Sequence, residues 1–233
     1  MMAAKPAVER CYRLWYRLLL EDMDSVAPQY RSHAAVEIGS GSSFLHDLRP
    51  GIITSDIVPG DVNLVLDGRA LPFATGSVRA LFLTHVFHHI PDVESFLREA
   101  DRVLTPTGVI SIVDETHTRF AKFFFSSIHP EPYNDDAVEW SFPPGHTMLD
   151  SNQALTWMVF FRDRAKFQKV APNLTLERWR YLPWFSYLLS GGVNLRSLVP
   201  RPLAGVFAAL DRALTPLDRF FAIHWHLTVR KRA

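Results

Sequence analysis

Apolar runs and helix-like segments alternate through the first half of the chain, and this order predicts an α/β fold. Five short runs are continuously apolar or β-branched, which is typical of strands buried on both faces of a parallel sheet. They span residues 34–38, 51–56, 62–66, 79–84 and 109–113. Apolar residues at helical spacing predict a helix over 93–104, and the following Thr-Pro-Thr-Gly predicts a turn.

The second half of the chain has longer and more varied segments. Helical spacing predicts a helix over 152–169. Residues 174–182 and 221–229 alternate between apolar and polar side chains and therefore predict two further strands. Between these strands lie an apolar, aromatic stretch over 183–193 and an apolar stripe at helical spacing over 203–221. Such a stripe is more typical of a core-facing helix than of a lipid-binding surface, although it also suits a dock for a bulky apolar ligand.

Two segments flank the predicted sheet strands. Residues 7–23 predict an amphipathic helix with an aromatic face and a separate arginine face. We expect this helix to cover the ligand pocket, and its arginines leave open a contact with a membrane surface. Residues 116–150 are rich in loop-forming residues but hold too many aromatics for disorder. We expect this segment to form a lid and one wall of a substrate site.

A glycine turn follows the first predicted strand. Glu37 stands near the strand end, and Gly39 and Gly41 form a Gly-x-Gly turn that lets a ligand lie against bare backbone. Asp56 ends the second strand at the spacing where a carboxylate can bind a ribose diol, and Asp67 follows the third. Parallel strands end at one edge of a sheet, so the pattern predicts a nucleotide-type cofactor site there.

These motifs resemble those of the class I S-adenosylmethionine-dependent methyltransferases of the small-molecule type. The first motif of that family matches residues 37–41, with Ser43 where a third glycine is usual. The ribose-binding acid matches Asp56, and the adenine-contacting acid with its Leu-Pro-Phe matches Asp67 and residues 71–73. Residues 83–90 and 96–110 resemble the segments that follow, so the resemblance covers roughly 33–115.

The resemblance implies a Rossmann-like, seven-stranded, mostly parallel sheet with helices on both faces, an added acceptor cap and a closing antiparallel strand pair. It implies S-adenosyl-L-methionine as cofactor, with the methionine end at the glycine turn, the ribose at Asp56 and the adenine near Asp67. The expected cofactor-binding residues are Glu37, Gly39, Ser40, Gly41, Asp56, Ile57, Asp67, Gly68, Leu71, Thr84 and His85. We expect one domain over 1–233, divided into a helical cap (1–30), a cofactor-binding core (31–115), a substrate loop (116–150) and a sheet-completing part (151–233) with a helical insertion at 183–220.

Histidines supply the candidate catalytic bases, because methylation of a hydroxyl requires a base that is active near neutral pH. His85 directly follows the fourth strand, while three others lie in the predicted lid. The candidates are His85, His117, His129 and His146. The close spacing of His85, His88 and His89 also suits a metal site, but members of the resembled family carry such a pair without metal, so no metal is expected.

Composition limits the remaining possibilities. Hydrophobic residues make up 48% and charged residues 21% of the chain, as in folded globular proteins. A net charge of +1 without an aromatic-basic cluster gives no reason to expect nucleic acid. The one cysteine fits a cytoplasmic location, and no signal peptide or stretch of ~20 apolar residues is present.

The sequence therefore predicts a methyltransferase that acts on a small or a lipid- or glycan-linked acceptor, with O-methylation favoured and peripheral membrane contact left open. A nicotinamide-dependent oxidoreductase is the first alternative, although Phe44 replaces its third glycine and Asp67 is an additional acid. A non-catalytic module that binds S-adenosylmethionine is the second.

Overall fold

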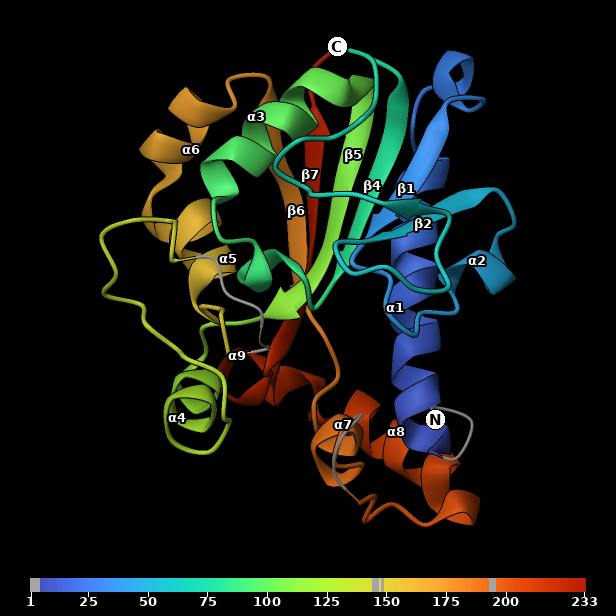
Figure 1. Ribbon diagram of the computed structural model, residues 1–233. Helices are drawn as coiled ribbons and strands as arrows, with labels where there is room; N and C mark the ends of the chain where they lie inside the picture. Colours follow the sequence, from blue (N-terminus) through green and yellow to red (C-terminus); the bar gives the residue numbers. More distant parts are fainter. Residues whose placement is uncertain (1–4, 144–146, 148, 193–195) are drawn as a thin grey trace.

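A twisted sheet runs through the centre of the protein in the computed structural model, which describes residues 5–143, 147, 149–192 and 196–233 (Figure 1). Its strands are β1 (Ala34–Ile38), β2 (Ile52–Asp56), β3 (Leu64–Val65), β4 (Val78–Thr84), β5 (Leu104–Glu115), β6 (Leu174–Tyr181) and β7 (His224–Lys231). The seven strands lie in the order β3-β2-β1-β4-β5-β7-β6. β1 to β5 pair in parallel, whereas β7 is antiparallel to both β5 and β6. The predicted fold class and the inserted final strand are therefore confirmed.

Helices cover both faces of the sheet. They are α1 (Pro6–Asp24), α2 (Leu45–Leu48), α3 (Val93–Val103), α4 (Arg119–Ser127), α5 (Leu155–Trp157), α6 (Arg164–Val170), α7 (Phe185–Leu189), α8 (Ala204–Leu214) and α9 (Asp218–Phe221). Short turns are η2 (Pro28–Tyr30), η3 (Phe87–His89), the π-turn η4 (Met158–Arg162), η5 (Arg201–Leu203) and η6 (Thr215–Leu217).

Two hydrophobic clusters separate the layers. On one face, α3, α5 and α6 pack over side chains such as Val36 and Ile110. On the other, α1 and α2 pack over Ala35, Phe82 and Val109, so successive residues of one strand serve opposite faces. This burial on both sides explains why the parallel strands read as continuous apolar runs.

Helix α1 confirms the predicted amphipathic pattern. Its aromatic face is buried, and Arg10, Arg13 and Arg17 are exposed. At its end, Asp22 is fully buried and accepts hydrogen bonds from Ser111 of β5 (2.6 Å), Thr228 of β7 (2.8 Å) and His226 Nε2 (3.0 Å), and it pairs with Arg178 of β6. Burial opposes ionisation, but these partners hold the pKa of Asp22 near about 2. One carboxylate thereby ties α1 to three strands.

Several predicted boundaries are wrong. The third strand is two residues long, and the turn predicted after the 93–104 helix lies inside β5, where the register with β4 shifts between Val78 and Ala80. The 152–169 helix is divided into α5, η4 and α6. The 116–150 segment contains α4, and the last strand starts at His224 because α9 occupies the residues before it.

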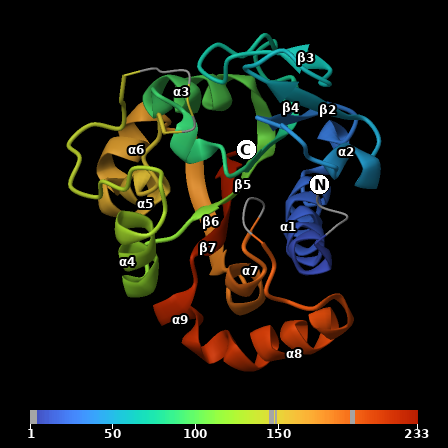
Figure 2. The ribbon, with the colours of Figure 1, turned by 60° about the horizontal axis from the view of Figure 1, so that its bottom comes forward.

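The insertion before β7 also differs from its predicted packing. α7 and α8 lie beyond the carboxyl ends of the parallel strands, and α8 forms an outer rim in Figure 2. α8 is held by buried Asp211, which accepts a hydrogen bond from the Ser186 backbone N–H of α7 (3.1 Å). The apolar stripe faces solvent over much of its length, with Leu203, Val206, Leu210, Leu217 and Phe221 exposed. The expectation that this stripe faces the core is therefore wrong.

Candidate active site

The glycine turn lies where β1 ends. Gly39 and Gly41 both have positive φ values, 65° and 49°. A Cβ on Gly39 would lie 2.6 Å from Cγ2 of Val86, whereas a Cβ on Gly41 would meet open space. The Ser40 backbone N–H donates to the Ser55 carbonyl (2.7 Å), which fixes the turn against β2. Only glycine fits position 39 without moving a neighbour, so the backbone there stays bare.

Glu37 lies beneath this turn and is almost completely buried. Its Oε1 accepts a hydrogen bond from Ser43 Oγ (2.7 Å), while Oε2 has no hydrogen-bond partner. Burial raises the pKa of Glu37 to about 7, against the opposing hydrogen bonds from Ser43 and Ser40. A buried carboxylate with a free oxygen is suited to a cationic ligand.

A cavity of about 190 Å³ opens above Glu37. It is lined by Tyr12, Tyr16, Glu37, Gly39, Ser40, Ser42, Ser43 and Thr84. Tyr16 donates to Ser43 Oγ (3.0 Å), so α1 forms one wall of the cavity, as expected of a helix covering the pocket. The two tyrosines were not among the predicted cofactor-binding residues; the only signal for them was the aromatic face of α1.

Asp56 borders the same turn from β2. Its Oδ2 accepts the Gly41 backbone N–H (3.0 Å), and its Oδ1 accepts the Val58 N–H (3.1 Å). Ile57, beside it, is 61% exposed. The structure therefore places Asp56 and Ile57 at the edge of the glycine turn, where sequence spacing had placed the ribose-binding acid.

Asp67 has a different environment. Its carboxylate forms an ion pair with Arg69 (2.6 Å), and hydrogen bonding from Arg69 lowers the pKa of Asp67. A Cβ on Gly68 would lie 3.4 Å from Phe96, and buried Leu71 donates its backbone N–H to Glu99 (2.9 Å). These three residues form a packed corner, in which the Asp67 carboxylate already has a cationic partner.

His85 follows the last residue of β4 in a conformation that is uncommon for a side-chain-bearing residue. Its φ is 56°, and its backbone N–H donates to the Val113 carbonyl of β5 (2.8 Å). This backbone directs the ring against Trp15 and His224, with ring centroids 5.2 and 4.7 Å away. Its Nδ1 lies 2.9 Å from Glu115 Oε1, and its Nε2 has no partner.

Next to the His85–Glu115 pair lies a buried group formed by His88, Asp114 and Glu115. His88 Nδ1 is 2.6 Å from both Asp114 Oδ1 and Glu115 Oε2. Burial disfavours the charged forms of all three groups, but the two carboxylates raise the pKa of His88 well above its usual value. His88 and His85 in turn hold the pKa of Glu115 well below the ordinary range, while burial and Glu115 raise that of Asp114 to about 7.

The remaining candidate bases lie elsewhere. His117 stacks on Trp157, with ring centroids 3.8 Å apart, and its Nδ1 contacts the Tyr133 hydroxyl. His129 Nδ1 lies 3.0 Å from Gln153 Nε2. Burial lowers the pKa of both imidazoles. His146 lies outside the described residues. Of the candidate bases in the described chain, His85 is the one adjacent to a residue of the Glu37 cavity.

Sequence reasoning did not single out His224. Burial and the neighbouring His85 lower its pKa well below the usual value, so this ring is neutral. In the sequence, His224 is visible only as one of the polar residues that alternate with apolar ones in the last strand. Its position next to Glu115 depends on the insertion of β7 beside β5, where the two residues are register partners.

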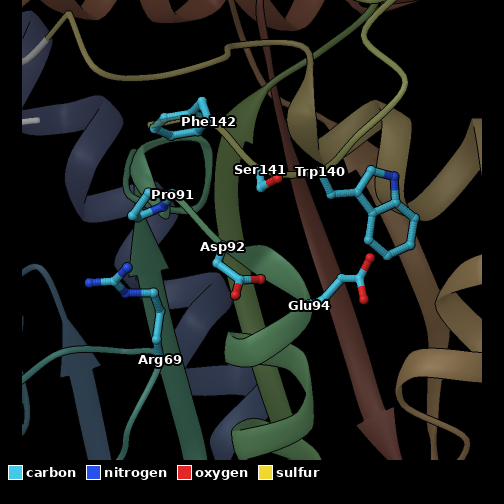
Figure 3. Close-up of a pocket in the computed structure, with 7 residues that line it drawn as sticks. All are labelled: Arg69, Pro91, Asp92, Glu94, Trp140, Ser141 and Phe142. Carbon is cyan, nitrogen blue, oxygen red and sulfur yellow. The ribbon is translucent and has the colours of Figure 1, made fainter. Parts of the chain in front are cut away.

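A second cavity, of about 250 Å³, lies at the start of α3 (Figure 3). It is lined by Arg69, Pro91, Asp92, Glu94, Trp140, Ser141 and Phe142. Asp92 caps α3 by accepting the Ser95 N–H (3.1 Å), so its carboxylate already has a structural role. This cavity shares no lining residue with the Glu37 cavity, and none of the predicted cofactor-binding residues lines it.

Comparison with known proteins agrees with this geometry. Residues 37–112 match the family model described as a methyltransferase domain. The YcgJ protein of Bacillus subtilis superposes with a TM-score of 0.54 at 16% identity, covering 95% of this chain and 99% of that one. Geranyl diphosphate C-methyltransferase from Streptomyces coelicolor A3(2), solved with Mg²⁺, geranyl diphosphate and S-adenosyl-L-homocysteine, has a TM-score of 0.53 at 12% identity, covering 97% and 82%. No curated protein matches the sequence.

The match identifies a methyltransferase domain over residues 37–112, and the sheet has the strand order of the class I methyltransferase fold. The matched residues include the glycine turn, Asp56, Asp67 and His85. The oxidoreductase alternative is thereby set aside. Among the described residues, no helix has both the length and the apolar character needed to cross a membrane.

Proposed function

We propose that the Glu37 cavity holds the methionine end of S-adenosylmethionine. The unpartnered, buried Glu37 Oε2 fits a cationic ammonium, and the bare backbone of Gly39, Ser40 and Gly41 permits close approach. Thr84 also lines the cavity, and Asp56 accepts a hydrogen bond from the turn, where we place the ribose. When bound, the cofactor supplies an electrophilic methyl group on a positively charged sulfur.

The adenine is assigned to the corner formed by Asp67, Gly68 and Leu71, and the exposed Ile57 is proposed to contact it as well. Asp67 must share its carboxylate with Arg69 to take part, since the two form an ion pair in the structure. An Arg69→Ala variant would release that carboxylate. Tighter binding of S-adenosylhomocysteine by this variant than by the parent would support a direct contact from Asp67, and weaker binding would count against it.

His85 is proposed as the general base for methylation of a hydroxyl. The observation that carries this proposal is the His85–Glu115 pair beside the cofactor cavity, 2.9 Å from Nδ1 to Oε1. With its Nδ1–H donated to Glu115, the imidazole has a buried Nε2 lone pair without a hydrogen-bond partner. This lone pair can accept the hydroxyl proton once the acceptor displaces the side chains that bury the nitrogen in the free protein. The ionised Glu115 then stabilises the imidazolium, as the carboxylate of a catalytic triad does. His117 and His129 have other partners, and His146 remains a sequence-based candidate.

The acceptor is proposed to be lipid- or glycan-linked. The support is the exposed apolar rim of α8, which lies beyond the carboxyl ends of the strands together with exposed arginines of α1 (Figure 2). Arg10 contacts the Ala204 carbonyl at the start of α8 (3.4 Å), so apolar and cationic groups share this end of the protein. Such a surface suits an anionic lipid interface, and enzyme action at the inner face of a membrane fits the predicted cytoplasmic location.

Tritium-labelled S-adenosylmethionine tests the reaction. The protein is incubated with lipid-linked sugars, free sugars and phenols, and label transferred to each is measured. We expect transfer that resists mild alkali, as a methyl ether does, and a loss of about 10²–10⁴-fold in His85→Gln. His117→Gln serves as the matched control and retains activity. Equal rates in His85→Gln and the parent, with cofactor binding intact, would remove His85 from the base role.

A further inference from the structure

The side chains of His88, His89 and Glu131 lie close together, next to the His85–Glu115 pair. His88 and His89 are adjacent residues of η3, and Glu131 comes from the segment after α4. Glu131 Oε2 lies 3.3 Å from His88 Nε2 and 3.5 Å from His89 Nε2. One ligand atom from each residue lies within 4.8 Å of the other two.

These separations match the edges of a metal coordination sphere. Nitrogen and oxygen ligands lie ~2.0–2.1 Å from a tetrahedral zinc ion, so neighbouring ligand atoms are about 3.3 Å apart. The neighbouring acid–histidine pairs are closer together than that. His85 Nδ1 is 2.9 Å from Glu115 and His88 Nδ1 is 2.6 Å from Asp114, and both are hydrogen-bond distances. Spacing thus distinguishes the His88–His89–Glu131 group from the acids behind it.

The second layer of contacts orients these ligands. Asp114 Oδ1 lies 2.6 Å from His88 Nδ1, so Nε2 is the ring nitrogen that faces Glu131. A metal ion bound there would replace the proton that His88 Nε2 carries in the metal-free protein. A carboxylate behind a histidine is the usual support of a metal-binding imidazole. On the other side, buried Gln153 donates its Nε2–H to Glu131 Oε2 (2.8 Å). Both supports come from elements far apart in sequence.

Charge favours a cation at the same place. Asp114 and Glu115 are buried and Glu131 is largely so, and all three lie within 3.3 Å of a His88 ring nitrogen. Accumulated carboxylates in a protected site require compensating positive charge. The side chains of His89 and Glu131 keep 20% and 14% exposure, so two of the three ligand side chains reach solvent.

We propose that His88, His89 and Glu131 bind a divalent transition-metal ion, with zinc as the best match to two imidazoles and one carboxylate. The ion would fasten the segment around Glu131 to the end of η3, beside the acceptor side of the sheet. This proposal departs from the expectation of no metal drawn from the sequence. It is independent of which acceptor is methylated and of His85 as the base.

The test is zinc binding by protein stripped with a chelator and dialysed. Calorimetric titration with zinc chloride should show one saturable site per chain, and cobalt(II) should give the visible absorption of a four-coordinate ion. His89→Ala and Glu131→Gln should each abolish this site. Asp114→Asn, which replaces the carboxylate behind His88 with a neutral amide, should weaken binding ~10–100-fold. Magnesium, which prefers oxygen ligands, should not compete at equal concentration.

His46→Ala is the matched control, because His46 is an exposed histidine on α2 that pairs with Asp47. It should bind zinc as the parent does. Circular dichroism of each variant separates loss of the site from loss of fold. If the parent takes up no zinc, or if His89→Ala and Glu131→Gln bind it as well as the parent, the three side chains form only an ion-pair network and the proposal fails.

Discussion

The unpartnered oxygen of Glu37 predicts a proton linkage in cofactor binding. Because burial raises the pKa of Glu37 to about 7, the carboxyl is largely protonated at pH 6 in the free protein. A bound cation favours the charged form and lowers that pKa, so binding releases a proton. Affinity for S-adenosylhomocysteine should therefore rise from pH 6 toward pH 8.

Calorimetry at pH 6.5 in buffers of different ionisation enthalpy measures this release. We expect about three-quarters of a proton per binding event in the parent and none in Glu37→Gln. This variant should also bind more weakly and with a flatter pH dependence. Equal proton release in both proteins would show that another group titrates.

Gly39 and Gly41 offer a second prediction, since both have positive φ but only one is crowded. An alanine at either position costs about 1–2 kcal/mol through the backbone conformation. Gly39→Ala also forces its Cβ against Val86, so it should lose more stability and bind S-adenosylhomocysteine more weakly than Gly41→Ala. Adding Val86→Ala should recover part of the difference. Urea unfolding and calorimetry decide this, and indistinguishable single variants would contradict it.

At the scale of elements, α1 depends on one buried carboxylate for its attachment to β5, β6 and β7. Asp22→Ala leaves His226 and Arg178 without their acceptor, and removing one partner from such a buried network costs about 3–5 kcal/mol. Asp24→Ala, on the same helix, removes only the exposed pair with Arg49 and should cost about 0–1 kcal/mol. Urea unfolding at pH 7 measures both, and similar losses would disprove the anchoring role.

The same anchor has a defined pH range. The folded-state pKa of Asp22 is about 2, below the value of 3.8 for an unperturbed carboxyl. A lowered pKa contributes stability that is present above pH 4 and is lost as pH falls toward 2. The parent should therefore lose stability more steeply between pH 4 and pH 2 than Asp22→Asn, as followed by thermal unfolding.

The helices and strands also differ in how accurately the sequence predicted them. The parallel strands were readable because burial on both faces leaves an unbroken apolar run, and α1 because one of its faces is aromatic. β3 was overestimated because it pairs only through two residues at the sheet edge. The 152–169 helix was predicted as continuous, but the chain forms the π-turn η4 and breaks at Asp163, whose side chain accepts the indole N–H of Trp140 (2.8 Å). A tertiary contact of this kind leaves no local pattern.

The candidate site shows the same division. The placement of Glu37, Gly39 and Asp56 at one edge of the sheet was predictable because it depends on strand ends and fixed spacing. Tyr16 and His224 were not, because they reach the site from α1 and β7, far from the motif in sequence. The apolar stripe of α8 has the same helical period whether the helix faces the core or the solvent. Only the three-dimensional packing therefore shows that this stripe is exposed.

At the scale of the whole molecule, the exposed rim predicts lipid binding. Val206 and Leu210 are 54% and 41% exposed, on a helix that Arg10 contacts. The protein should sediment with phosphatidylglycerol vesicles more than with phosphatidylcholine vesicles. Val206→Asp with Leu210→Asp should reduce this binding at least tenfold, because each change places a charge in the interface.

Val138→Asp is the control for that experiment, since Val138 is 82% exposed in the segment between α4 and α5. It should bind vesicles as the parent does. Equal binding by the rim variant and the control would mean that α8 is not the lipid-facing surface, while absence of binding to either vesicle would favour a free, water-borne acceptor.

The position of β7 has a consequence for synthesis on the ribosome. Residues 224–231 follow all other described elements in the chain, yet they lie between β5 and β6. While they are still inside the ribosomal tunnel, β5 has an open edge and β6 has no strand to pair with. An unpaired edge is a template for pairing with other chains, so the nascent protein is most prone to aggregation after β6 has emerged and before β7 has. His224 reaches His85 only after that stage, so the proposed catalytic site is assembled after the strands β1 to β5 have emerged.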